Sequence, residues 1–185
     1  MNKDTVERFR QGDKTAFSLL VERFQKPLFS YLGKMGLPQA VCEEVAQETF
    51  IRAWQACNHF DPLRSAIGTW LFTIARRLAI NELQRAAHRY ESTHTKLSFT
   101  NDACDASETQ TRMNLSLSKS QQFLYQALQT LSAEDRSLLA LAYLRELDFK
   151  TIAKIEDIPV GTVKSRLYRI REQLKTTLKG GKHDE

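Results

Sequence analysis

Apolar residues recur along the chain at spacings of three and four, the period of a helix with one face turned toward a core. The first such stripe runs from Phe17 to Leu32 and is expected to end between Gly33 and Gly36. Similar patterns cover residues 40–57, 67–89 and 121–178. The alternation that indicates strands is missing. The pattern therefore predicts an all-α fold.

Polar residues divide the chain into two parts. From Glu91 to Ser118 the sequence is rich in Ser, Thr, Asn and Asp and poor in large apolar residues, which is typical of a flexible polar linker. Each flanking part is long enough for a modest core. We therefore expect two small helical domains, residues 1–90 and 119–180, joined by a linker over residues 91–118.

Residues 148–178 indicate a helix-turn-helix, the motif that presents one helix to the major groove of DNA. Asp148 suits the N-cap of the first helix, with Phe149 and Ala153 on its inner face. Asp157 tolerates the backbone of a tight turn, and Pro159 suits the first turn of the next helix.

The second helix of this motif is strongly basic and carries its apolar stripe, Val163 to Leu178, on one face. Its other faces are expected to reach outward to DNA through Thr162, Lys164, Ser165, Arg166 and Arg169. The alternative is an ordinary amphipathic surface helix.

The helix predicted over residues 40–57 has an acidic, amide-rich face that also contains Ile51 and Trp54. Exposed apolar side chains within a polar face are typical of a protein-docking surface. The candidate contact residues are Glu44, Gln47, Glu48, Ile51, Trp54 and Gln55. The alternative is that another helix of the same domain covers Trp54.

The helix predicted from Ile67 onward is basic instead. One ridge carries Arg77, Asn81, Gln84 and His88, and the arginines Arg64, Arg76 and Arg85 add positive charge. Arginines suit phosphates, and Asn and Gln can contact base edges. Trp70, beside the loop over residues 58–65, could stack on an unpaired base; the alternative, favoured for a single ring, is that it belongs to the core.

The amino-acid composition adds little to the interpretation of these surfaces. The net charge of +5 and a pI near 9.2 favour a polyanionic partner only weakly. Three cysteines without CxxC spacing and four scattered histidines indicate no metal site and no disulfide framework.

No nucleophile–base pair or phosphate loop is seen, so we expect no catalytic residues and no cofactor. No signal segment or membrane span is seen, which favours a cytoplasmic protein without membrane insertion of its own.

Three segments together resemble the bacterial extracytoplasmic-function sigma factors, the two-domain specificity subunits of RNA polymerase. They are EEVAQETFIRAW (43–54), TWLFTIARRLAINELQR (69–85) and IPVGTVKSRLYRIREQL (158–174). The resemblance covers most of the chain, from about Phe17 to Leu178.

This resemblance implies a role for each part. Residues 1–90 would be sigma region 2, which binds core RNA polymerase and melts the −10 element, with Phe60 and the helix up to Arg89 meeting the DNA. Residues 119–180 would be sigma region 4, which reads the −35 element. Promoter DNA, core polymerase and an anti-sigma factor are the implied partners, and the anti-sigma factor would hold the protein inactive, in some cases at the inner membrane.

The chain departs from the resembled pattern in the turn of the helix-turn-helix. Glu156-Asp157 stands where Leu-Gly is common, so the angle between the two helices is not carried over. Two alternatives stay open: a stand-alone helix-turn-helix regulator whose first half senses a ligand or dimerises, and an adaptor that keeps the motif only as a scaffold.

Overall fold

A computed structural model describes residues 1–96, 124 and 126–180 of the chain. The described residues form helices and connecting turns and contain no strand. The predicted all-α fold is therefore confirmed.

The first half is built from four α-helices and one short 3₁₀ helix. These are α1 (Lys3–Arg10), α2 (Lys14–Lys34), α3 (Gln39–Gln55), η1 (Cys57–His59) and α4 (Ile67–Lys96). The stripe predicted from Phe17 onward lies on α2, where Leu20, Leu28, Tyr31 and Leu32 are fully buried. Helices α3 and α4 pack against α2 and against each other around these side chains.

Helix α1 was not predicted, because its apolar content is low. Asn2 caps it by accepting a hydrogen bond from the Thr5 N–H, and Phe9 is its buried residue. Asp13 then caps α2 by accepting from the N–H groups of Thr15 and Ala16. Those hydrogen bonds and the Arg8 guanidinium lower the pKa of the Asp13 carboxyl.

The second half contains α7 (Ala133–Leu139), the π-helical turn η2 (Ala140–Leu144), α8 (Phe149–Glu156) and α9 (Val160–Gly180). Asp148 caps α8, and Asp157 adopts the left-handed conformation with φ 56°. The residues assigned to the cap and turn of the helix-turn-helix therefore have those roles. Phe149 differs from expectation: its side chain is 39% exposed and lies under the Lys164 ammonium, 5.9 Å from the ring centre.

Helix α4 continues through Lys96 and thus extends into the segment predicted as linker. Residues 97–118 of that prediction lie outside the described residues.

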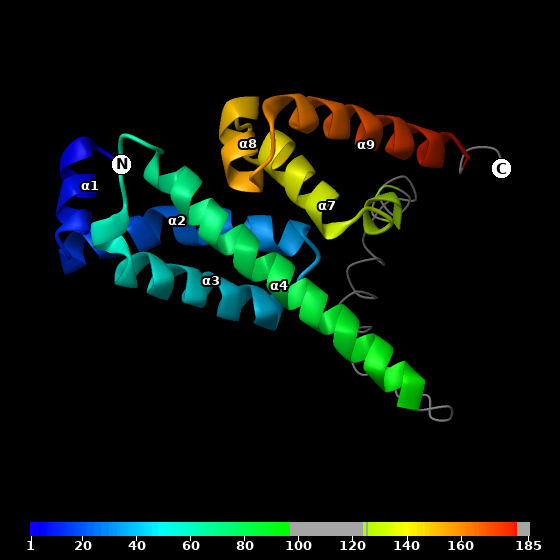
Figure 1. Cartoon of the computed structure of the whole chain (residues 1–185), viewed down its shortest axis with the longest axis horizontal. Helices are drawn as coiled ribbons and strands as arrows, with labels where there is room; N and C mark the ends of the chain where they lie inside the picture. Colours follow the sequence, from blue (N-terminus) through cyan, green and yellow to red (C-terminus); the bar gives the residue numbers. More distant parts are fainter. Residues whose placement is uncertain (97–123, 125, 181–185) are drawn as a thin grey trace.

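The two halves pack against each other. Helix α8 lies across α4, and α7 contacts both α2 and α4. Figure 1 shows α7, α8 and α9 on one side of α4 and α3 on the opposite side. Gly36 lies against the guanidinium of Arg136 on α7. Its φ of 96° favours glycine.

Candidate polymerase and nucleic-acid interfaces

The predicted docking face lies along α3. Glu44, Gln47 and Gln55 are exposed, and Ile51 keeps 42% of its surface accessible although it is aliphatic. Glu48 is partly buried and forms an ion pair with Arg52 at 2.6 Å. The polar face with an apolar centre that the sequence predicted is therefore present on the surface.

Trp54 falls between the two interpretations of this face. Its ring is partly buried and packs on Phe17 of α2, with ring centres 4.9 Å apart. The first half thus covers one side of the indole. Ile51 lies on the same helix, about one turn before Trp54.

The basic ridge of α4 is also on the surface. Its exposed side chains are Arg77, Asn81, Gln84, Arg85 and His88. Arg85 bonds to Glu82 one turn away, at 2.6 Å. This ridge places cationic and amide groups along one edge of a helix, as contacts to phosphates and bases require.

Arg76 is turned away from that ridge. Its side chain is only 16% exposed, and its Nε lies 2.8 Å from the Glu156 carboxylate of α8. Arg64, in contrast, is highly exposed in the loop before α4 and lies 3.5 Å from Asp61. The structure therefore separates two arginines that the sequence grouped together.

The aromatic rings before and within α4 form a cluster. Phe60 is 2% exposed and packs on Trp70 with ring centres 5.0 Å apart, and Trp70 also meets Phe9 edge-on. Phe60 is thus a core residue in this arrangement, and its ring is not accessible to a base. A cavity of about 700 Å³ lies beside this cluster, between the loop over residues 60–66, the start of α4, and Arg145 and Leu147 of the second half.

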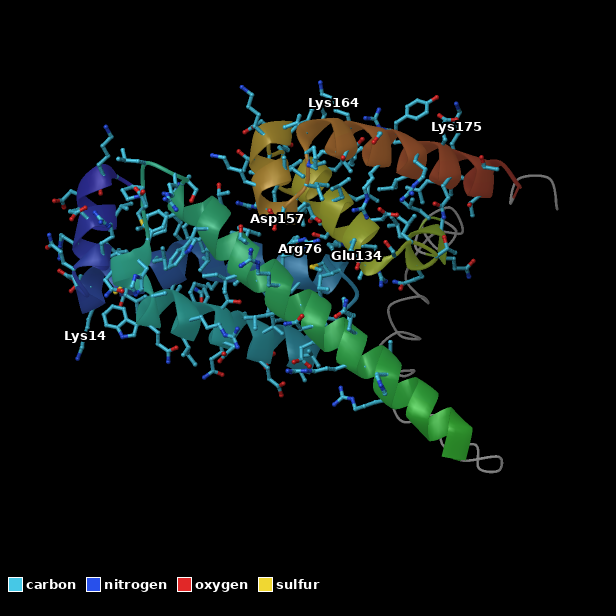
Figure 2. The ribbon with its side chains drawn as sticks, in the orientation of Figure 1. Lys14, Arg76, Glu134, Asp157, Lys164 and Lys175 are labelled. Atoms are coloured by element: carbon cyan, nitrogen blue, oxygen red, sulfur yellow. The ribbon has the colours of Figure 1, made fainter. Side chains whose placement is uncertain are left out.

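The residues of α9 that were predicted to contact DNA differ in how exposed they are. Lys164 and Ser165 are exposed and Thr162 is partly buried. Figure 2 shows Lys164 and Lys175 on the side of α9 that faces away from α4. Val163, Leu167 and Ile170 form the buried stripe, as predicted.

Arg166 and Arg169 are held by an acid on α7, which the sequence did not indicate. Both bind the carboxylate of Asp135 on α7: Arg166 donates from Nε and Nη2, at 3.1 and 2.6 Å, and Arg169 donates from Nη2 at 2.9 Å. Arg166 is 24% exposed, whereas Arg169 keeps 63% of its side chain accessible.

Asp135 is the residue near this site that sequence reasoning missed. Its N–H donates to the hydroxyl of Ser132, the N-cap of α7. Its carboxylate is nearly buried, and its arginine partners lie 31 and 34 residues away. Nothing in the local pattern indicates such a long-range pairing.

Two further observations concern the described residues alone. None of their helices is both long enough and apolar enough to cross a bilayer. They also contain no group of three His, Cys, Asp or Glu side chains suited to holding a metal ion.

Comparison with known families assigns both halves. Sigma-70 region 2 matches residues 20–89, and Sigma-70, region 4 matches residues 121–174. The chain is 35% identical over 179 residues to the ECF RNA polymerase sigma-E factors of Salmonella typhimurium and Escherichia coli K12, covering 91% of this chain and 90% of each relative. The Haemophilus influenzae sigma-E factor is 33% identical over 182 residues, covering 94% of this chain and 93% of its own length.

These matches span both halves and the segment between them. The chain belongs to the ECF RNA polymerase sigma factors, a family of transcription initiation factors that are not enzymes.

Two solved structures share the fold. CnrH in complex with the cytosolic domain of CnrY aligns with a TM-score of 0.66 and 22% identity, covering 95% of this chain and 96% of CnrH. The sigma factor RpoE of Bartonella quintana, in complex with the anti-sigma factor NepR, gives a TM-score of 0.65 and 24% identity, covering 91% of this chain and 98% of RpoE.

Proposed function

We propose that this chain binds core RNA polymerase through the exposed face of α3 and directs it to promoters with its two basic surfaces. The ridge of α4 from Arg77 to His88 contacts the −10 region, and α9 reads the −35 element. The observation that carries this proposal is family membership over nine-tenths of the chain, joined to an exposed face of the expected chemistry at each position. The working units are residues 1–90 and 119–180.

The proposed activity is binding, without a catalytic step by this chain. Opening DNA costs a few kcal/mol per unstacked step, and stacking of captured bases returns about 1–3 kcal/mol each. Contacts to phosphates supply non-specific affinity, so promoter binding weakens steeply as salt rises. The chain acts where the polymerase does, in the cytoplasm.

An anti-sigma factor is the proposed regulator, in a stress or envelope response. A sigma factor of similar fold, RpoE of Bartonella quintana, was solved in complex with the anti-sigma factor NepR. Such a partner also offers a way to hold the chain at the inner membrane until a signal arrives.

The α3 face can be tested with two matched substitutions. Ile51→Glu places a charge at the apolar centre of the face, and Leu19→Glu does the same at an equally exposed apolar residue of α2, which is 45% accessible. Ile51→Glu should weaken binding to purified core polymerase about tenfold or more, as loss of a central interface residue does. Leu19→Glu should bind as the parent does. Fluorescence anisotropy of the labelled chain measures both.

Far-UV circular dichroism must show that both variants keep their helices. If Ile51→Glu and Leu19→Glu bind core polymerase equally well, α3 is not the docking face.

A further inference from the structure

A buried polar contact joins the two halves of the molecule. The hydroxyls of Tyr31 (α2) and Ser137 (α7) lie 2.6 Å apart. Ser137 donates to one carboxylate oxygen of Glu156 (α8), at 2.5 Å, so the Tyr31 hydroxyl is the donor to Ser137. The other carboxylate oxygen lies 2.8 Å from Nε of Arg76 (α4). Four helices, two from each half, meet at this point.

This contact is in the interior and not on a rim. Tyr31 and Ser137 are fully buried, Glu156 is 3% exposed, and Arg76 is 16% exposed. The Arg76–Glu156 contact is an ion pair without hydrogen-bond geometry. A buried carboxylate is costly unless a cation opposes it, and removal of one partner leaves a charge uncompensated. The cation in direct contact with Glu156 is Arg76, which belongs to the other half.

Three further contacts bring the same surfaces together. The Lys154 ammonium donates to the backbone carbonyl of Arg64 at 3.0 Å. The Arg145 guanidinium lies 5.3 Å from the ring centre of Phe72. The Arg136 guanidinium of α7 lies against Gly36 of the first half. Contacts from α7, α8 and the segment between them thus fix one position of the second half on the first.

Glu156 is also one of the two residues at which the turn departs from the resembled pattern. A leucine there would offer nothing to Arg76. The acid is explained mainly by the opposing half. Within its own half, Glu156 bonds to the neutral hydroxyl of Ser137, and the charge of Arg166 on α9 acts on it less than that of Arg76 does.

We propose that the Arg76–Glu156 pair sets the position of the second half on α4 and holds the free chain in a closed arrangement, in which the two halves are packed together. In this arrangement α4 exposes Arg77 but not Arg76. The position of Arg76 follows from the geometry alone. Its consequence for the −10 region rests on the proposed function. Figure 2 shows Arg76 on the side of α4 that meets α7 and α8, below the end of α8 at Asp157.

The Arg76–Glu156 pair itself adds little to the stability of the closed arrangement. Burial raises the pKa of the Glu156 carboxyl in spite of the Ser137 hydrogen bond and the Arg76 charge, so burial outweighs both partners. Separation of the halves returns this carboxylate to water. The pair therefore determines where the second half packs on the first, and contributes little to how tightly the two halves are held.

Charge reversal across the pair tests the proposal in the free, full-length chain. Arg76→Glu places two carboxylates together in the interior and should separate the halves. Arg77→Glu makes the same change at the neighbouring, exposed residue and should leave them closed. The double variant Arg76→Glu/Glu156→Lys restores opposite charges and should close the chain again.

Small-angle X-ray scattering gives the radius of gyration of each variant. We expect Arg76→Glu to increase it by about 3 Å or more, as separation of two domains of this size requires, while Arg77→Glu and the double variant match the parent. Far-UV circular dichroism confirms that helix content is kept. If Arg76→Glu loses helix, Arg76→Gln replaces it with the same expected direction, because Glu156 again loses the cation of the other half.

Equal radii for the parent, Arg76→Glu and Arg77→Glu would overturn the proposal, and so would an expansion that the double variant does not reverse. Scattering requires neither polymerase nor DNA. A chain that closes through this pair but fails to bind core polymerase would refute the proposed function, whereas the proposed role of the Arg76–Glu156 pair would still hold.

Discussion

Arg166 and Arg169 both lie on the face of α9 expected to meet DNA, yet both donate to one buried carboxylate. Asp135 accepts three hydrogen bonds from them. Hydrogen bonds between charged groups are stronger than neutral ones, and a held guanidinium loses less freedom when it meets a phosphate. Asp135 is therefore expected to position the two arginines for −35 recognition.

Asp135→Asn should lower the affinity of the chain–core complex for a −35 duplex although it makes the chain more positive. We expect a loss of about three- to tenfold, since flexible arginines must then be ordered on binding. Glu134→Gln, at the preceding residue, carries the same charge change and serves as the control. Anisotropy titrations with a labelled duplex measure both variants, and equal affinities would refute the positioning role.

Glu156 adds a pH dependence at the same scale. Burial raises its pKa above the ordinary value of 4.5, so the folded chain holds this proton more tightly than the unfolded chain does. Its stabilising contribution is complete below pH 4.5 and is lost as the pH rises through the raised value. The groups around it are Arg76 on α4, Ser137 on α7, and Arg166 on α9; Tyr31 on α2 has a raised pKa because it is buried.

Glu156→Gln should remove this dependence. The amide keeps the shape and can bond to Ser137, without the cost of a buried charge. Thermal unfolding followed by circular dichroism should show the Tm of the parent falling relative to Glu156→Gln as the pH rises from 4.5, with a constant difference at higher pH. The lowered pKa values of Asp13 and Asp148 act in the opposite sense, below their ordinary value of 3.8, and are common to both chains. A difference in Tm that does not change with pH would contradict this assignment.

At the scale of elements, the period of apolar residues was enough to place α2, α3, α4 and α9. The cap and turn of the helix-turn-helix also followed from local chemistry, because Asp148 and Asp157 act within a few residues of their own positions. Helix α1 was missed since its stability depends on a single buried ring, Phe9, and on a cap at Asn2.

Long-range pairing is what the sequence did not reveal. Asp135 with its two arginines, and Arg76 with Glu156, join helices that are far apart along the chain. Projection of one helix at a time left Arg76, Arg166 and Arg169 facing outward. Phe60 and Trp70 show the same limit, because whether a ring is buried depends on the neighbour that packs on it.

At the scale of the whole molecule, the closed arrangement leaves some candidate surfaces free and occupies others. The docking face of α3, the α4 ridge from Arg77 to His88, and Lys164 on α9 are exposed together. Arg76 is held between the halves. Under the proposed function, core polymerase meets the chain first through α3, and separation of the halves then releases Arg76 toward DNA.

Transcription by purified core RNA polymerase is the most direct test of the central claim, that this chain selects promoters for the polymerase. Core enzyme is incubated with sheared genomic DNA, with and without the chain, and the 5′ ends of the RNA are sequenced. The account predicts a discrete set of start sites, preceded by shared −10 and −35 sequences, that appear only when the chain is present. Identical 5′ ends with and without the chain would contradict it.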